Sequence, residues 1–248
     1  MAEPDFSPCA VIPVYNHERP LPGVVGQLRS AGLPCLLVDD GSNAACAAVM
    51  DELAQQPNIH LLRLPSNQGK GGAVMAGLRE AERLGYSHAL QVDADGQHDL
   101  STLDHFITTA RAHPQTLVCG YPQYDASVPK SRLYARYLTH VWVWINCLSL
   151  QIRDSMCGFR VYPLPATLAL LDTVKLGRRM DFDTEILVRM AWREQPMHWL
   201  PTRVHYPADG LSHFRLWHDN LLISGMHARL FFGMLLRAPR ILWRRLVA

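Results

Sequence analysis

The chain has 248 residues, of which 48% are hydrophobic and 19% charged, with 24 basic and 22 acidic side chains. A chain of this length can bury a sizeable core, and its low charge argues against intrinsic disorder. The net charge of +2 gives no reason to expect a nucleic-acid partner. The six cysteines form no C-x-x-C pair and the start MAEPDFSPC lacks the features of a signal peptide, so we expect a cytoplasmic protein.

Short apolar runs alternate with helix-length amphipathic stretches over the first 120 residues. The runs predict strands at residues 9–14, 35–38, 59–64, 89–92 and 117–119. The spacing of apolar residues between them predicts helices at 21–31, 44–55, 71–84 and 103–112. This alternation is typical of an α/β domain with a mostly parallel central sheet flanked by helices. Ligands of such sheets bind beyond the carboxyl ends of the strands, so the polar residues there are candidates for a site.

The rhythm changes after residue 120. Residues 122–129 are predicted to form a loop, 131–150 a helix, and 187–192 part of another helix. Five prolines interrupt the remainder, namely Pro163, Pro165, Pro196, Pro201 and Pro207. Because no repeat or linker divides the chain, we expect the second half to form the other wall of the same site.

The sequence QVDADGQH (residues 91–98) is the clearest candidate for chemistry. Asp93 and Asp95 stand one residue apart where a strand should end, and alternate residues of an extended chain share a face. Both carboxylates can therefore approach one cation, and Gln97 offers a neutral ligand. Mg²⁺ and Mn²⁺ prefer such oxygen ligands. Taken alone, an Asp-x-Asp is more often a solvated turn.

Three further polar motifs follow predicted strands and should lie on the same edge of the sheet. They are IPVYN (12–16), VDDGS (38–42) and NQGKGGA (67–73). Tyr15 can stack on a base, and Asp40 can accept hydrogen bonds from a base or ribose. A glycine-rich helix start with Lys70 suits phosphate oxygens, through free N–H groups and a point charge. Each motif alone is compatible with a turn or a cap, whereas four in order favour a nucleotide site.

The order of these four motifs resembles that of the family 2 glycosyltransferases, which have the GT-A-type nucleotide-diphospho-sugar transferase fold. The likeness continues in DSMCGFR (154–160) and FDTEIL (182–187), which are similar to segments of members like dolichyl-phosphate mannose synthase. It covers roughly residues 9–215. The resemblance implies a glycosyltransferase that moves a sugar from a nucleotide-diphosphate donor, with inversion, using a divalent metal, Mg²⁺ or Mn²⁺.

The resemblance also implies roles for individual residues. The residues expected to bind the nucleotide sugar are Pro13, Tyr15, Asn16, Asp40, Lys70 and Asp93. The residues expected to hold the metal are Asp93, Asp95 and Gln97. The catalytic candidates are Asp154, Asp183 and Glu185 as general bases. Arg160 is a candidate ligand of an acceptor phosphate or a partner of Asp154. His17 stands where many relatives have glutamate, which leaves the choice between UDP and GDP open.

Residues 216–248 are predicted to form a basic amphipathic helical segment after a glycosyltransferase domain of residues 1–215. The arginines of this segment, at 229, 237, 240 and 244, fall on one side of a helix, and most apolar side chains fall on the other. We therefore expect peripheral contact with an anionic membrane surface at the inner face of the cytoplasmic membrane, and a lipid-linked acceptor such as a polyprenyl phosphate. Packing of the apolar side against the domain is an equal alternative.

Two other functions remain open on the sequence alone. A nucleotidyltransferase also uses an α/β sheet, glycines, a lysine and paired carboxylates, but its glycine-rich loop should follow the first strand directly. IPVYNHE occupies that place here. A non-catalytic sugar-nucleotide-binding protein is the other alternative, and the intact Asp-Ala-Asp is evidence against it.

Overall fold

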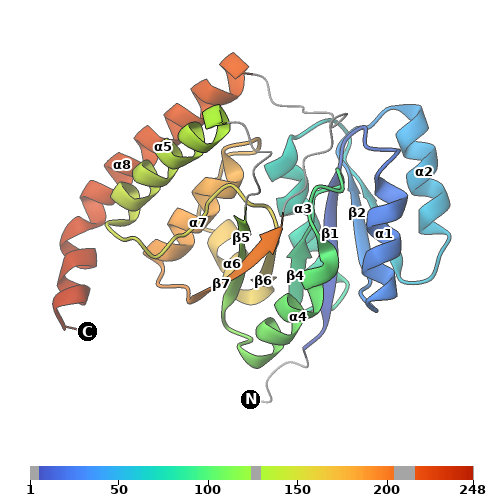
Figure 1. The fold of residues 1–248 in the computed structure, drawn as a ribbon, viewed down its shortest axis with the longest axis horizontal. Helices are drawn as coiled ribbons and strands as arrows, with labels where there is room; N and C mark the ends of the chain where they lie inside the picture. The colour runs from blue at the N-terminus through green and yellow to red at the C-terminus, as the bar shows by residue number, and fades with distance from the viewer. Residues whose placement is uncertain (1–5, 124–129, 204–215, 248) are drawn as a thin grey trace.

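The structure is a computed structural model that describes residues 6–123, 130–203 and 216–247. Within these ranges a seven-stranded sheet with the order β3-β2-β1-β4-β6-β5-β7 forms the centre of the molecule, with helices on both faces (Figure 1). The strands are β1 (Pro8–Val14), β2 (Cys35–Asp39), β3 (Ile59–Arg63), β4 (His88–Gln91), β5 (Leu117–Gln123), β6 (Arg160–Pro163) and β7 (Met197–Arg203). The helices are α1 (Leu21–Ser30), α2 (Ala44–Ala54), α3 (Lys70–Arg83), α4 (Leu103–Ala112), α5 (Lys130–Cys147), α6 (Leu164–Leu171), α7 (Phe182–Trp192) and α8 (Leu216–Val247).

Strands β1 to β4 form a parallel sheet, as the alternation of apolar runs and helical stretches predicts. Val14 lies opposite Asp39 in the pairing of β1 with β2, and Val11 lies opposite Gln91 in the pairing of β1 with β4. The carboxyl ends of these strands therefore meet at one edge of the sheet, where the polar motifs follow. The prediction of an α/β fold with a mostly parallel sheet flanked by helices is confirmed.

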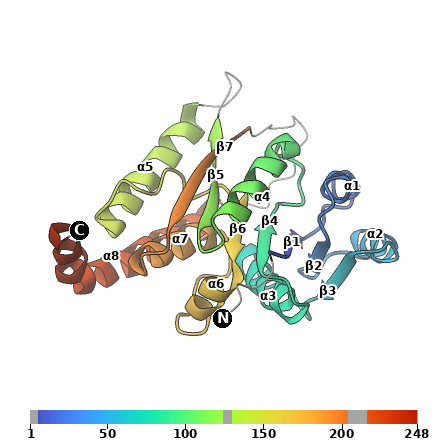
Figure 2. The same ribbon diagram turned by 90° about the horizontal axis from the view of Figure 1, so that it is seen from below.

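Helices lie on both faces of the sheet (Figure 2), and an apolar core on each face holds them in place. On one face α1, α2 and α4 bury side chains that include Leu28, Met50 and Phe106. On the other face α3 and α7 bury Leu78 and Ile186, among others. Each of these helices turns its apolar stripe toward the sheet, and the same stripe is what makes it recognisable in the sequence.

Strand β6 was not predicted, and it determines how the second half of the chain reaches the site. It lies antiparallel between β4 and β5, with Arg160 opposite both Gln91 and Cys119. The segment that leads into β6 therefore lies beside the loop that follows β4. His98 of that loop stacks on Phe159, with ring centroids 5.4 Å apart.

Prolines account for the elements that the sequence did not reveal. Pro165 lies in the first turn of α6, where a missing N–H costs no helical hydrogen bond, and Pro201 lies in the edge strand β7. Strand β5 also continues through Pro122 to Gln123. The expected loop is therefore wrong at residues 122 and 123, and residues 124–129 lie outside the described ranges.

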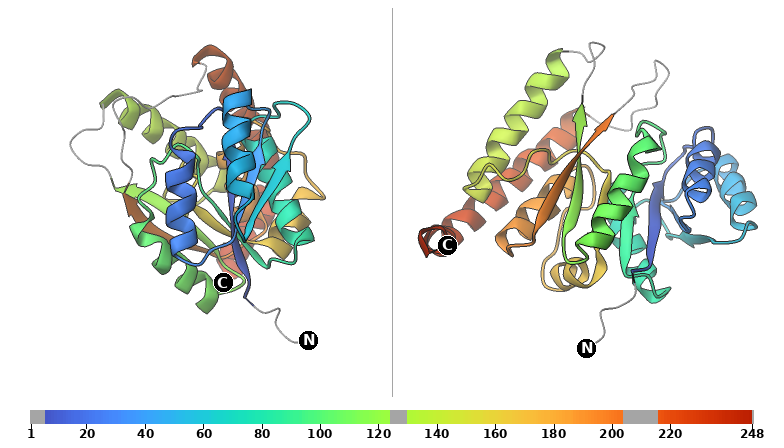
Figure 3. Two further views of the ribbon diagram at one scale, coloured as in Figure 1. Left: turned by 90° about the vertical axis from the view of Figure 1, so that its right-hand side faces the viewer. Right: turned by 60° about the horizontal axis from the view of Figure 1, so that its bottom comes forward.

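Helices α5, α7 and α8 form a layer at one end of the sheet, next to β5 and β7 (Figures 1 and 3). Trp192 of α7 donates a hydrogen bond from Nε1 to the carbonyl of Asn146 of α5 at 2.8 Å. The predicted helix at 131–150 corresponds to α5, and α8 continues through Pro239 without ending. The expected domain boundary after residue 215 lies outside the described residues.

Helix α3 approaches the sheet closely because Gly77 has no side chain. A Cβ placed on Gly77 would lie 2.4 Å from Val11 Cγ1 and 2.9 Å from Val38 Cγ2. Either valine, or the helix itself, would have to move to accept it, so this glycine sets the distance between α3 and β1–β2.

We predict that Gly77→Ala lowers the free energy of unfolding by about 1–3 kcal/mol, the usual cost of overpacking a core. The matched control is Gly26→Ala in α1, where an added Cβ meets nothing within 4 Å. Loss of a helical glycine there should stabilise the protein by about 0.5–1 kcal/mol. Urea unfolding of both variants checks this, and equal stabilities would contradict it.

Candidate active site

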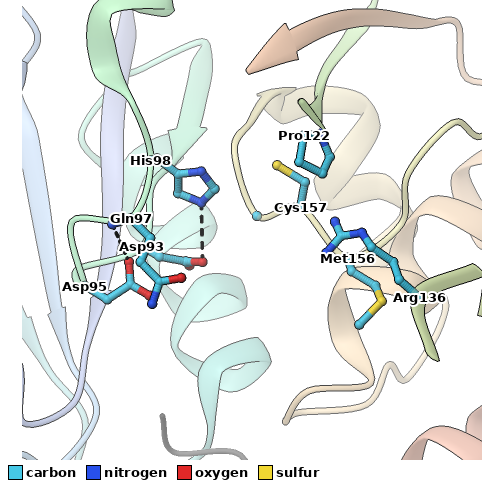
Figure 4. Close-up of a pocket in the computed structure, with 9 residues that line it drawn as sticks. Asp93, Asp95, Gln97, His98, Pro122, Arg136, Met156 and Cys157 are labelled. Carbon is cyan, nitrogen blue, oxygen red and sulfur yellow. Dashed lines mark hydrogen bonds and ion pairs between the residues drawn. The ribbon is translucent and has the colours of Figure 1, made fainter. Parts of the chain in front are cut away.

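A pocket of about 90 Å³ lies beyond the carboxyl end of β4 (Figure 4). It is lined by Asp93, Asp95, Gln97 and His98 from the loop after β4, and by Pro122, Arg136, Met156, Cys157 and Gly158 from the second half of the chain. Figure 4 shows the aspartates on one side of the pocket and Arg136 on the other. The pocket therefore has an acidic wall and a basic wall.

The acidic wall gathers the three residues that the sequence assigns to a metal. The side chains of Asp93, Asp95 and Gln97 lie next to one another in Figure 4. Asp95 Oδ1 accepts a hydrogen bond from the backbone N–H of Gln97 at 3.0 Å. Burial, together with the neighbouring charge of Asp93, raises the pKa of Asp95 above its ordinary value. An additional positive charge here would therefore relieve a repulsion between two carboxylates.

Lys70, the first residue of α3, joins Asp93 to Asp183 of α7. Its Nζ lies 2.9 Å from each oxygen of Asp93 and 2.9 Å from Asp183 Oδ2. Burial lowers the pKa of Lys70, but the charges of Asp183 and Asp93 outweigh burial and hold that pKa above its ordinary value. Burial also raises the pKa of Asp93, and the Lys70 charge reverses this effect and keeps it well below its usual range. Lys70 and Asp93 are therefore both ionised.

The side chains of the acidic wall fit a divalent cation. Asp93 and Asp95 offer carboxylate oxygens and Gln97 an amide oxygen, which are ligands that Mg²⁺ and Mn²⁺ prefer. Asp93 Oδ1 is buried and receives no hydrogen bond from the residues that the structure describes, and its contact with Lys70 Nζ at 2.9 Å is an ion pair. The described ranges contain no group of three or more His, Cys, Asp or Glu that could hold a metal. A metal held here would therefore complete its shell with water and the phosphate oxygens of a ligand.

Asp40 holds the glycine-rich segment after β3. Its Oδ1 accepts a hydrogen bond from the N–H of Gln68 at 2.6 Å, and its Oδ2 accepts one from Gly69 at 2.9 Å. The N–H of Gly72 donates to the Arg178 carbonyl at 2.9 Å. The expectation of free N–H groups for phosphate is therefore wrong at these three positions. Burial raises the pKa of Asp40, and this effect exceeds the lowering by the hydrogen bonds from Gln68 and Gly69.

The glycines of this segment instead allow α3 to approach the chain before α7. Gly69 has φ +85, and a Cβ on it would lie 2.6 Å from the Arg178 carbonyl oxygen. A Cβ on Gly71 would lie 2.3 Å from Phe182 Cβ. Because neither glycine has a side chain, the start of α3 lies directly against this segment, and Lys70 reaches a carboxylate of α7.

The residues after β1 lie at the same edge of the sheet. Pro13 is half-buried in β1, and the Tyr15 side chain is 36% exposed. Asn16 has φ 56, in the left-handed region that asparagine tolerates. Its N–H donates to Ser42 Oγ at 3.2 Å, and its Oδ1 accepts from the N–H of Asn43 at 2.7 Å. These bonds hold the loops after β1 and β2 side by side, with the Tyr15 ring accessible to a ligand.

Asp154 lies behind the basic wall and is 2% exposed. Arg136 donates to its two oxygens at 2.6 Å each, and His140 Nε2 lies 3.2 Å from Oδ2. The N–H groups of Met156 and Cys157 donate to Oδ1 at 2.9 and 2.7 Å. Burial alone would raise the pKa of Asp154, but His140 and Arg136 hold it well below its usual range. Asp154 therefore orients Arg136 and the loop that forms the wall.

Arg160 is fully buried and lies outside the pocket lining. It donates hydrogen bonds to the carbonyls of Asp183 at 2.8 Å and Ser155 at 2.9 Å, and to the Tyr162 hydroxyl at 3.2 Å. Its Nη1 is also 3.8 Å from Asp183 Oδ1. In place of the expected contact with Asp154 or an acceptor phosphate, Arg160 therefore supports the chain that carries Asp183.

Sequence reasoning missed Arg136. An arginine in a predicted helix is most often a solvated surface residue, so its type alone gives no signal. The available signal was its i,i+4 spacing from His140, which places both side chains on one helix face and suits a shared carboxylate.

The family model described as glycosyl transferase family 2 matches residues 9–162. The chain belongs to glycosyltransferase family 2. Its relatives include dolichyl-phosphate beta-glucosyltransferase of Dictyostelium discoideum, 27% identical over 71% of this chain and 60% of the relative. Polyprenol monophosphomannose synthase of Mycolicibacterium smegmatis is 30% identical over 61% and 60%, and undecaprenyl-phosphate mannosyltransferase of Micrococcus luteus is 30% identical over 73% and 76%. The chain thus spans about 60% of the length of the first two.

Solved structures confirm the GT-A-like fold expected for a family 2 member. Glucosyl-3-phosphoglycerate synthase from Mycobacterium tuberculosis, in complex with Mn²⁺ and UDP-glucose, is similar with a TM-score of 0.65 and 13% identity, over 94% of this chain and 79% of that one. S. aureus TarS with UDP-GlcNAc is similar with a TM-score of 0.59 and 13% identity, over 90% and 66%. At these identities the likeness establishes the fold.

The lowered pKa of Asp154 predicts how the stability of this family 2 protein depends on pH. Because the folded pKa lies below the unfolded value of about 3.9, the stabilisation is present above that value and is lost as the pH falls further. Asp154→Asn should therefore lose more stability at pH 7 than at pH 3, measured by urea unfolding. Asp172→Asn, which removes an exposed ion pair with Arg79, is the control and should change little at either pH. A uniform loss for Asp154→Asn at both pH values would contradict the prediction.

Proposed function

We propose that the protein transfers a sugar, with inversion at the anomeric carbon, from a nucleotide-diphosphate sugar to a lipid-linked phosphate of the polyprenyl type. The observation that carries this proposal is the pocket with Asp93 and Asp95 on one wall and Arg136 on the other. A metal-bound diphosphate suits the acidic wall and an acceptor phosphate suits the basic one, because each anion then faces a cation. Residues 1–215 would carry this site.

The carboxylates near the pocket support a phosphate acceptor rather than a hydroxyl. An acceptor hydroxyl needs a general base, whereas a phosphate is already ionised. Asp154 is paired with Arg136, and Asp183 with Lys70. Glu185, a third candidate base, is fully buried in an ion pair with an arginine of its own helix. All three carboxylates are therefore engaged by cations, and the lowered pKa of Asp154 makes it a weak proton acceptor.

The proposed reaction assigns a task to each group of residues. The Tyr15 ring and the loops after β1 and β2 receive the nucleotide. The charge that grows on the diphosphate as the sugar–phosphate bond breaks would be neutralised by the metal that Asp93, Asp95 and Gln97 hold. Arg136 holds the acceptor phosphate on the opposite wall, so that its oxygen attacks the anomeric carbon from the side away from the leaving group.

The names of similar proteins support the same classes of donor, acceptor and metal. The curated relatives are named for transfer to dolichyl phosphate and undecaprenyl phosphate, or for synthesis of a polyprenol monophosphomannose. Structural neighbours were solved with UDP-glucose and Mn²⁺, or with UDP-GlcNAc. Membership of family 2 also favours a glycosyltransferase over the nucleotidyltransferase alternative.

Arg136→Lys tests the acceptor. We expect the wild type to transfer a sugar to a polyprenyl phosphate and not to the corresponding polyprenol. The lipid product is detected by mass spectrometry. Arg136 binds Asp154 through Nε and Nη2, and a lysine cannot keep both bonds and also hold a phosphate. The KM for the phosphate acceptor should therefore rise roughly tenfold, with a smaller effect on the KM for the donor. Arg79→Lys, in an exposed ion pair, is the matched control. Transfer to the polyprenol, or an unchanged acceptor KM in Arg136→Lys, would count against this acceptor assignment.

The contacts of α8 favour a mode of membrane contact other than the one expected from the sequence. Arg229 lies 3.4 Å from Glu185, and Arg244 lies 2.5 Å from Glu194. The Arg237 guanidinium lies over the Trp192 ring, 4.7 Å from its centroid. Three of the four arginines expected to face lipid therefore face α7 and the residues after it.

The exposed side of α8 is apolar instead. Its large exposed apolar side chains are Trp217, Leu221, Phe232, Leu235, Leu236, Leu242, Trp243 and Leu246. At 100° per residue these fall within an arc of about 120°, so they form one stripe along the helix. Among the described residues, the one helix long and apolar enough to cross a bilayer lies here, at Trp217–Arg244 with a mean hydropathy of 1.3. We propose that this stripe contacts the membrane peripherally, at the inner face of the cytoplasmic membrane.

Sedimentation with vesicles distinguishes apolar from electrostatic binding. The stripe predicts binding to both zwitterionic and anionic vesicles, with little loss at high salt. Leu236→Asp should weaken binding at least tenfold, because burying one leucine contributes about 1.5–3 kcal/mol. Arg240→Gln, an exposed basic residue beside the stripe, is the control and should change binding little. Binding that requires anionic lipid and disappears at high salt would restore the basic-face explanation.

A further inference from the structure

The ammonium group of Lys70 lies against Asp93, in the position of a cation bound by this carboxylate. Its Nζ is 2.9 Å from both oxygens of Asp93, the residue that begins the Asp-x-Asp. The Lys70 side chain is 19% exposed and that of Asp93 is 23% exposed. A charged amine in this position neutralises Asp93 as a metal ion would.

We propose that Lys70 is a stand-in cation, which holds the place of the divalent metal at Asp93 and must leave Asp93 for the metal to bind. The inference rests on the proposed function in one respect, since it takes the cation site of that proposal as given. It adds a regulation of that site: the affinity of the protein for metal is set by competition with its own lysine.

The contacts of Asp183 make a short movement of Lys70 possible. Lys70 Nζ is bound equally closely to Asp183, so it can release Asp93 and keep a carboxylate partner. Asp183 is supported independently, by Gln91 Nε2 at 3.1 Å and by Arg160. The Lys70 side chain has a flexible four-carbon stem, and its ammonium group donates hydrogen bonds without the planar geometry of a guanidinium. A small displacement of Nζ therefore costs little free energy.

Gly158 brings the pocket wall close to the amine. A Cβ on Gly158 would lie 2.9 Å from Lys70 Nζ and 3.0 Å from Asp93 Oδ2. Gly158 and Asp93 both line the pocket, so the ammonium lies directly behind the pocket wall that a ligand would meet. An incoming diphosphate can attract the amine from that side through its negative oxygens.

The competition predicts that metal and donor bind cooperatively. Without a diphosphate, Lys70 stays bound to Asp93. It then weakens metal binding, because it occupies the Asp93 carboxylate and its positive charge repels the metal ion. When a diphosphate binds Lys70, Asp93 is left to the metal, so each ligand strengthens the other by the same factor.

Binding of Mn²⁺ alone to the full chain tests the inference, with free Mn²⁺ measured by electron paramagnetic resonance. We expect Lys70→Met to bind Mn²⁺ at least tenfold more tightly than the wild type in the absence of nucleotide. Lys175→Met, which removes the same charge from an exposed position, is the matched control and should bind as the wild type does. Addition of the nucleoside diphosphate, uridine or guanosine, should strengthen Mn²⁺ binding in the wild type and much less in Lys70→Met.

Each outcome decides a separate question. If the wild type binds Mn²⁺ and Lys70→Met binds it equally or more weakly, the stand-in role is wrong while the proposed metal site stands. If neither protein binds Mn²⁺ with or without a diphosphate, the metal part of the proposed function fails, and this inference fails with it. Lys70→Gln, which keeps a hydrogen bond to Asp93 without the charge, carries the same expectation if Lys70→Met does not fold.

Discussion

The ion pairs of Lys70 with Asp93 and Asp183 are the constraint on which the site depends. Carboxylates that are largely removed from water stay ionised only if cations and N–H donors compensate them. Lys70 supplies that charge from the amino end of α3, and Arg160 supports Asp183 from β6. Because these residues come from both halves of the chain, the same charge compensation that maintains the site also fixes the second half against the parallel sheet.

Close approach of backbones is the second requirement, and glycines provide it at each contact. Gly71 lets α3 touch Phe182, and Gly77 lets it touch the sheet. Gly158 lets the segment before β6 pass beside Lys70 and Asp93. A side chain at any of these positions would separate the charged groups. The attraction between two charges would then weaken, because it is inversely proportional to their distance. The glycine-rich motif therefore acts here mainly by positioning a lysine, and less by presenting N–H groups.

The sequence predicts the parallel half of the fold and the edge where the site lies. Apolar runs and helical stripes report local periodicity, which β1 to β4 and α1 to α4 follow closely. Local periodicity could not reveal that Arg160 contacts Asp183, because the antiparallel insertion of β6 brings them together. Nor could it reveal that Arg136 binds Asp154, because that pair depends on the packing of α5. Helical periodicity also separates the basic from the apolar side of α8 without saying which side meets the protein. The basic side faces the protein because acidic residues on and after α7 form ion pairs with its arginines.

The two walls of the pocket differ in how firmly their charges are held. Arg136 is fixed by two short hydrogen bonds to Asp154, whose oxygens also receive two backbone N–H groups, so its position is rigid. Lys70 contacts two carboxylates at once, so it can release one and keep the other. In the proposed reaction two anions, the acceptor phosphate and the diphosphate, must meet at one sugar, which costs Coulomb energy unless cations face both. A rigid guanidinium suits the acceptor, whose oxygen needs one direction of attack, whereas a movable ammonium suits the diphosphate, whose charge increases as the bond breaks.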